Sequence, residues 1–156
     1  MAAVRAVRIE QESPRAPDVL ALIAALDAFL GAIYPAASNH FLDLDTLRRP
    51  EVRFFVARAE SAAVGCGALW VRPDRGYGEV KRMFVRPEAR GMRIGARLLE
   101  AIVEEARREG LAVLRLETGV RSEAALGLYR AVGFAERGPF GEYGADANSV
   151  FMERGV

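Results

Sequence analysis

The segment that most constrains the fold runs from Val85 to Glu100, where an apolar strand pattern passes directly into an amphipathic helix. Pro87 ends the strand, and Gly91 and Gly95 give the following turn unusual backbone freedom. The first N–H groups of a helix have no intrahelical partner and lie at the positive end of its dipole. This turn therefore predicts a local anion site, for which pyrophosphate is a natural ligand. The alternative is that the glycines only relieve a tight turn.

The spacing within this turn excludes two familiar phosphate-binding loops. It has no Gly-Lys-Ser/Thr sequence, and its glycines do not form G-x-G-x-x-G, so neither a P-loop nor a dinucleotide fingerprint is present. Arg90, Arg93 and Arg97 surround the same helix start. Each would be unfavourable there by about 0.3–1 kcal/mol unless an anion is bound, which favours the binding interpretation.

The rest of the chain alternates short strand patterns with helical ones. Strands are expected over 4–10, 52–59, 62–71, 79–85, 112–117, 134–137 and 149–153, and helices over 19–33, 39–48, 94–109 and 122–133. This order is mixed α/β and is neither a regular βαβ repeat nor a sandwich. No linker or repeat interrupts it, so residues 1–156 are expected to form a single domain.

Composition limits the classes of partner and cofactor. A net charge of +1 does not favour nucleic acid, and the most apolar helix is too short and too charged to span a membrane. With one cysteine, Cys66, and one histidine, His40, we expect neither a disulfide framework nor a bound metal. Cys66 lies in an apolar run and is expected to be a buried, inert thiol. No signal peptide is apparent at the N-terminus, so a cytoplasmic location is expected.

The strand–turn–helix segment resembles motif A of the GNAT superfamily of N-acetyltransferases, in which V-x-P is followed by (Arg/Gln)-x-x-Gly-x-(Gly/Ala). Arg90 fills the first position and Gly95 the last, whereas Arg93 stands where the middle glycine is usual. A second block, SEAALGLYRAVGF over residues 122–134, resembles the family's N-x-x-A-x-x-x-Y-x-x-x-G-F, with Ser122 in place of asparagine. The order of strands and helices is similar over essentially the whole chain.

This resemblance implies a twisted, mostly antiparallel mixed sheet that is splayed at its central strands and flanked by helices. It also implies an acetyl-CoA-dependent N-acetyltransferase, in which the amine of a small molecule or amino acid attacks acetyl-CoA directly in a ternary complex. Two alternatives stay open: a non-catalytic acyl-CoA-binding or regulatory module, and a protein N-acetyltransferase. A homodimer also stays open.

The resemblance assigns three catalytic roles. Glu79 matches a general base that removes the amine proton directly or through water, with a solvated glutamate as the alternative. Tyr129 matches the general acid for the departing thiolate, with a core tyrosine as the alternative. A bulge in the strand 79–85 would free the Met83 N–H to polarise the thioester carbonyl.

The same resemblance implies the residues that bind the two substrates. Coenzyme contacts are expected from Met83, Phe84, Val85, Arg90, Gly91, Met92, Arg93, Ile94, Gly95, Ala96, Ser122 and Tyr129, although the Phe84 side chain itself is assigned to the core. Acceptor contacts are assigned to Tyr34, Asn39, His40, Lys81 and Arg82. Lys81, the only lysine, or Arg82 could anchor an acceptor carboxylate. The alternative for this pair is an ion pair with Glu79 or another surface acid.

Overall fold

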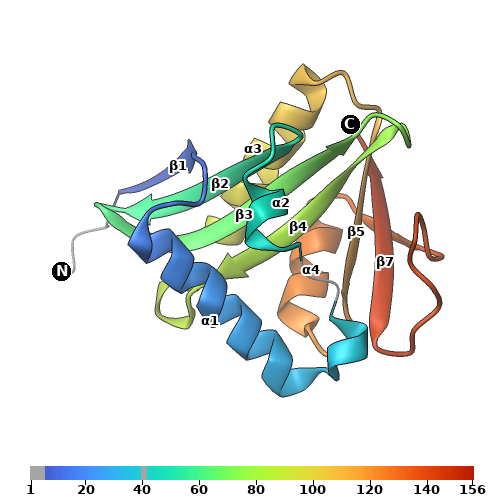
Figure 1. Ribbon diagram of the computed structural model, residues 1–156, viewed down its shortest axis with the longest axis horizontal. Helices are drawn as coiled ribbons and strands as arrows, with labels where there is room; N and C mark the ends of the chain where they lie inside the picture. Colours follow the sequence, from blue (N-terminus) through green and yellow to red (C-terminus); the bar gives the residue numbers. More distant parts are fainter. Residues whose placement is uncertain (1–5, 40–41) are drawn as a thin grey trace.

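The computed structural model describes residues 6–39 and 42–156, and its central element is a seven-stranded sheet in the order β1-β2-β3-β4-β5-β7-β6 (Figure 1). The strands are β1 (Val7–Gln11), β2 (Val52–Ala59), β3 (Ala62–Arg72), β4 (Tyr77–Val85), β5 (Val113–Gly119), β6 (Ala135–Arg137) and β7 (Ser149–Gly155). Every neighbouring pair is antiparallel except β4 and β5, which are parallel. The expected mostly antiparallel mixed sheet is confirmed.

Helices cover both faces of this sheet (Figure 1). The α-helices are α1 (Pro17–Ile33), α2 (Leu44–Leu47), α3 (Ile94–Arg108) and α4 (Glu123–Ala131), and the 3₁₀ turns are η1 (Ala36–Ser38) and η2 (Pro87–Ala89). Helices α1 and α2 lie on one face, and α3 and α4 lie on the other. Each face therefore has its own apolar core.

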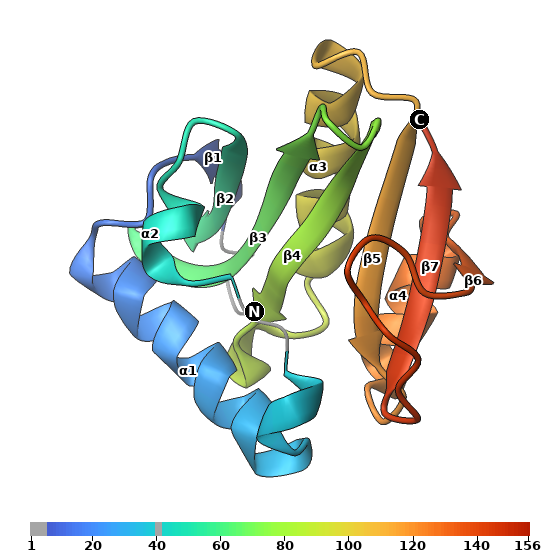
Figure 2. The same ribbon diagram turned by 45° about the vertical axis from the view of Figure 1, so that its right-hand side comes forward.

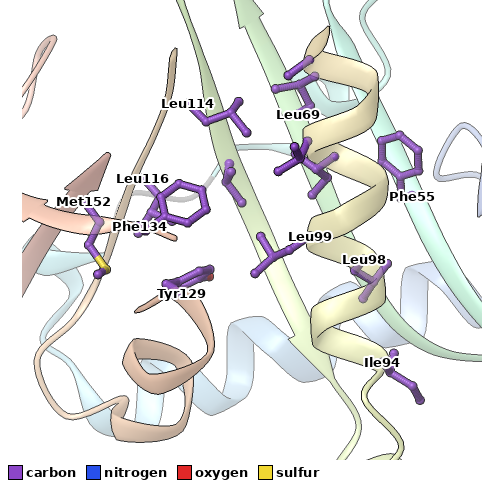
Figure 3. Close-up of a cluster of buried hydrophobic side chains, with 14 of the residues drawn as sticks. Phe55, Leu69, Ile94, Leu98, Leu99, Leu114, Leu116, Tyr129, Phe134 and Met152 are labelled. Atoms are coloured by element: carbon purple, nitrogen blue, oxygen red, sulfur yellow. The ribbon is translucent and has the colours of Figure 1, made fainter. Parts of the chain in front are cut away.

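The larger core forms where α3 packs on the sheet. Leu98, Leu99 and Ile102 of α3 are fully buried, as the helical spacing in the sequence predicts. They share one cluster with Leu69 of β3 and Leu114 of β5 (Figure 3). This packing fixes the direction of α3 and, with it, the position of the turn at its N-terminus.

The second helix differs most from the sequence prediction. Instead of one helix over 39–48, the chain forms η1 and then the short α2. The α2 helix begins only after Asp43, because the Asp43 side chain accepts a hydrogen bond from the Thr46 N–H. The helix expected over 122–133 is α4, and the side chain of Ser122, its N-cap residue, makes no capping hydrogen bond. Its hydroxyl lies 3.2 Å from the Tyr34 hydroxyl instead.

Strands β4 and β5 pair over only three residues and then separate (Figure 2). The paired segments are 78–80 of β4 and 114–116 of β5. Gly78 permits the close approach of the strands, because a Cβ there would lie 2.7 Å from Leu69 and 3.0 Å from Leu114. The predicted splay at the centre of the sheet is confirmed, and it opens beyond Val80.

A β-bulge interrupts β4 at the start of this splay. Cys66 of β3 pairs with Phe84 and Ala68 pairs with Lys81, so two residues of β4 face the single residue between them on β3. Arg82 has a φ of 59°, in the left-handed region. The bulge breaks the alternation of side chains, and Arg82 reaches Asp27 on α1. The expected bulge before Met83 is therefore present.

Candidate active site

A cavity of about 1060 Å³ follows the separation of β4 and β5. One end lies at the N-terminal turn of α3, and the other lies against the segment that joins α1 to α2. Its middle is walled by the bulged part of β4, by the end of β5 and by α4. One continuous space thus connects a helix N-terminus with the segment predicted to bind an acceptor.

The helix end of the cavity is built from backbone groups. Gly91 has a φ of 87°, and no atom lies within 4 Å of the place where its Cβ would be. Ile94, Gly95 and Ala96, whose amides have no partner further back in the helix, all line the cavity. The side chain of Arg93, the N-cap residue of α3, makes no capping hydrogen bond. These donors are therefore available to an anionic ligand.

The arginines of this turn separate into two groups. Arg90 and Arg93 line the cavity, whereas Arg97 donates to the carbonyl of Val7 and is not part of the cavity wall. The prediction that three arginines surround one anion site therefore has no support at Arg97. Met92, which is 37% exposed, does not line the cavity either, so its predicted coenzyme contact stays without support.

Arg93 occupies the left-handed region, with a φ of 58°. A side chain in this conformation costs about 1–2 kcal/mol, which explains why glycine is usual at this position. The chain keeps the turn geometry despite the substitution, and the residue that follows starts α3. The departure from the motif thus changes the side chain but preserves the backbone course.

Tyr129 lies on the opposite wall, where it is both a core residue and a cavity residue. Its ring packs edge-on against Phe134 at a centroid distance of 5.9 Å, and the side chain is only 6% exposed (Figure 3). It nevertheless lines the cavity. Burial raises the pKa of the Tyr129 phenol, and the negative charge of Glu117 raises it further. The phenol is therefore held in the protonated form, the form that can donate.

Glu79 is enclosed in a ring of polar groups. It is 2% exposed and does not line the cavity. The Tyr143 hydroxyl donates to Glu79 Oε2 at 2.5 Å, and Lys81 Nζ lies 3.2 Å from the same oxygen and donates to Tyr143 at 2.7 Å. The alternative prediction for Lys81, an ion pair with Glu79, is thus observed. Lys81 also lines the cavity, whereas Glu79, its ion-pair partner, does not.

Two polar residues of this region carry no prediction from the sequence. Glu117, near the end of β5, lines the cavity and accepts a hydrogen bond from Ser149 Oγ at 2.9 Å. An acidic residue ending a strongly apolar strand is the signal that could have indicated it. Tyr143 lies in a loop rich in glycine, where no periodicity marks one residue as inward-facing.

At the far end of the cavity, hydrogen bonds join segments that are distant in the sequence. The Tyr34 hydroxyl accepts from the Arg121 N–H at 3.0 Å. Ser38 Oγ donates to Asp146 at 2.7 Å and accepts from Asn148 Nδ2 at 3.3 Å. Tyr34 and Asn39, which were predicted to contact the acceptor, line this end together with Ser38 and Asn148. His40, the remaining candidate before β2, lies outside the described residues.

Two further observations bear on the chemistry. Cys66 is fully buried, its thiol donates to the carbonyl of Arg82, and burial raises its pKa to about 12. It is therefore the inert thiol that the sequence predicts. Within residues 6–39 and 42–156, no cluster of side chains has the composition of a metal site. No helix in these ranges is both long and apolar enough to cross a membrane.

Comparisons with known proteins agree on one family. Residues 20–134 match the family described as "Acetyltransferase (GNAT) family". An "IAA acetyltransferase" of Azospirillum brasilense is 57% identical over 148 residues, which is 95% of this chain and 97% of that protein. A candidate acyl-CoA N-acyltransferase from Klebsiella pneumoniae is 36% identical, with a TM-score of 0.79 over 96% of this chain and 97% of its own. An N-acetyltransferase from Thermoplasma acidophilum, crystallised with coenzyme A, has a TM-score of 0.71 at 18% identity over 97% and 99%.

Replacing Tyr143 with phenylalanine tests the polar ring. The change leaves the aromatic packing but removes the hydroxyl that joins Glu79 to Lys81, so we expect a loss of about 1–3 kcal/mol in the free energy of unfolding, measured by urea titration. The control is Tyr77→Phe, which removes a hydroxyl from the same aromatic cluster and leaves the ring around Glu79 intact. Equal losses in the two variants would contradict the bridging role of Tyr143.

Proposed function

This chain belongs to the GNAT family of acetyltransferases, and from that premise we propose that it transfers an acetyl group from acetyl-CoA to the amine of a small molecule. One observation carries the proposal: the continuous cavity of about 1060 Å³ has an anion-binding helix end, a buried phenol at its middle and a polar pocket at its far end. These three parts match the phosphate, thioester and acceptor regions that the reaction needs.

In this proposal the helix end holds the pyrophosphate of acetyl-CoA. Gly91, Ile94, Gly95 and Ala96 line this end, where the first amides of α3 have no partner within the helix, and Arg90 and Arg93 add positive charge beside them. The pantetheine arm then follows β4 and adds to the backbone of Val85 like a further strand. Ser122 and Tyr129 face it from α4 and the loop that precedes it.

The transfer takes place where the bulge meets α4. The amine nitrogen attacks the acetyl carbon, the carbon–sulfur bond breaks, and the departing sulfur takes a proton from the Tyr129 hydroxyl. The Met83 N–H, next to the bulge, stabilises the negative charge that develops on the carbonyl oxygen. The proton of the attacking amine goes to a carboxylate, for which Glu79 is the prediction from the sequence.

A small acceptor is supported by the size and chemistry of the far end. Tyr34, Ser38, Asn39 and Asn148 line the far end with polar groups, and hydrogen bonds tie Ser38 to Asp146 and Asn148. The relative at 57% identity bears the name of an IAA acetyltransferase, which is also consistent with a small acceptor. Lys81, on the cavity wall, could pair with a carboxylate of the acceptor.

A thiol-release assay with acetyl-CoA tests the function directly. Small amines, amino acids and polyamines are supplied one at a time, with basic peptides as a separate set. We expect coenzyme A to be released with at least one small amine, and the acetylated product to be detected by mass spectrometry. Release only with peptides would indicate the protein acetyltransferase. Tight binding of coenzyme with no release from any amine would indicate the non-catalytic module.

Replacing Gly91 with valine tests the phosphate cradle. A β-branched residue does not adopt a φ of 87°, so the turn must change course and lose charge-assisted hydrogen bonds worth about 1.5–3 kcal/mol. Calorimetry should show that acetyl-CoA binds about tenfold or more weakly. The matched control is Gly76→Val, at a φ of 75° in a loop outside the cavity, where the same backbone strain leaves coenzyme affinity unchanged. Unchanged affinity in a folded Gly91→Val protein would contradict the cradle.

Replacing Tyr129 with phenylalanine separates its two predicted roles. If the hydroxyl is the general acid, turnover of Tyr129→Phe should fall about 10²–10⁴-fold. The ring packing and the melting temperature should stay nearly unchanged, because only one oxygen atom is removed. The defect should shrink with a thioester whose leaving thiol is more acidic, because such a thiol needs less protonation. If the defect has the same size with both thioesters, Tyr129 positions the coenzyme without donating a proton.

A further inference from the structure

We propose that Glu117, near the end of β5, is the general base that accepts the proton of the attacking amine. This inference rests on the proposed acetyl transfer and concerns the carboxylate that completes it. It differs from the prediction made from the sequence, which places that role on Glu79 of β4. The two carboxylates differ in whether they line the cavity.

The register of β4 and β5 places Glu117 at the fork of the sheet. The last paired residues are Val80 and Leu116, so Lys81 and Glu117 are the first residues beyond the pairing. Leu116 is buried in the core beneath α3 and α4, and alternation along the strand sends the neighbouring Glu117 to the opposite face. The side chain therefore lies where the strands begin to separate, and it lines the cavity.

Glu79 is held away from the same space. Its Oε2 is engaged by the Tyr143 hydroxyl and by Lys81, and the side chain is 2% exposed. Lys81, the ion-pair partner of Glu79, lines the cavity. An acceptor amine could reach Glu79 only after this ring opened, whereas Glu117 already forms part of the wall. In this arrangement Glu79 and Tyr143 position the Lys81 ammonium.

Ser149 fixes the orientation of the Glu117 carboxylate. Ser149 of β7 donates its hydroxyl to Glu117 Oε1 at 2.9 Å, which fixes one carboxylate oxygen. Ser149 is the residue paired with Gly119 at the end of the β5–β7 ladder, so its hydroxyl is placed by the sheet itself. A base held by regular secondary structure keeps its geometry from one turnover to the next.

Glu117 and Tyr129 also act on each other. The negative charge of Glu117 contributes to the raised pKa of the Tyr129 phenol, so the two groups are close enough to interact electrostatically. Both line the same cavity, one from β5 and the other from α4. A carboxylate and a protonated phenol that face one space are the pair needed to remove one proton and supply another.

The proposed step balances in atoms and charge. The ammonium of the acceptor gives one proton to the Glu117 carboxylate, and the neutral amine then attacks the acetyl carbon of acetyl-CoA. The new carbon–nitrogen bond forms as the carbon–sulfur bond breaks, and the thiolate takes the phenolic proton. The second proton of the amine nitrogen returns to Tyr129, and the carboxyl of Glu117 releases its proton to solvent. The products are the amide, coenzyme A and one proton.

The test compares Glu117→Gln with Glu79→Gln in the thiol-release assay over a range of pH, using the acceptor found by the screen. For Glu117→Gln we expect turnover near neutral pH to fall about 10²–10⁴-fold, with coenzyme affinity unchanged by calorimetry. The loss of turnover in Glu117→Gln should become smaller as the pH rises toward the pKa of the amine. At higher pH a larger fraction of the acceptor amine is already deprotonated and needs no base. Glu79→Gln should chiefly raise the KM for the acceptor, because the ion pair that positions the Lys81 ammonium is lost.

Two further variants complete the design. Ser149→Ala should show a smaller, but equally pH-dependent, loss of turnover, because the Glu117 carboxylate remains and loses only the hydrogen bond that orients it. Glu153→Gln on β7 removes a carboxylate outside the cavity and should leave the pH–rate profile unchanged.

The proposal is overturned if Glu117→Gln keeps the parent's turnover and pH profile, or if the pH-dependent defect appears only in Glu79→Gln. Inactivity of the unchanged protein with every amine would instead overturn the proposed function, so the two failures are distinguishable.

Discussion

The three-residue parallel contact between β4 and β5 is the constraint on which the rest of the site depends. It joins the two parts of the sheet at Gly78–Val80, and Gly78 lets the strands meet without displacing Leu114. If the pairing continued, backbone hydrogen bonds would occupy the space that is now the cavity. If it were absent, no backbone pairing would hold Glu117 beside Lys81. The cavity is therefore an interruption in the sheet, and it begins where the hydrogen bonding between β4 and β5 stops.

Two strained backbone positions lie along the same cavity. Arg82 and Arg93 adopt left-handed conformations, which side chains rarely tolerate, and both line the cavity, whereas Glu60, the third such residue in the described part of the chain, does not. At Arg82 this geometry turns two successive cationic side chains to one face, and at Arg93 it redirects the chain into α3. Positions of this kind persist where the surrounding packing determines them. Here the fully buried stripe of α3 and the flanking strands supply that packing.

Sequence reasoning was effective for features set by neighbours in the chain. The strand patterns, the apolar stripe of α3 and the glycine turn at Gly91 depend on local periodicity and local backbone freedom. It was less effective for Glu117 and Tyr143, because their positions result from how strands far apart in sequence meet. The contact of Arg97 with the Val7 carbonyl could not be predicted either, because Val7 and Arg97 are brought together only by the packing of α3 beside β1.

The place of β7 in the sheet has a consequence for biosynthesis. Strands β1 to β4 and helix α3 can pack as soon as they have left the ribosome, since their contacts lie within the first two thirds of the chain. Strand β5 cannot, because its long ladder is formed with β7 at residues 149–155, and its contact with β4 is short. During translation the nascent chain thus completes the turn at the start of α3 before β5, α4 and the segment before β7 are made. The partly made protein would lack the cavity walls that these later elements provide.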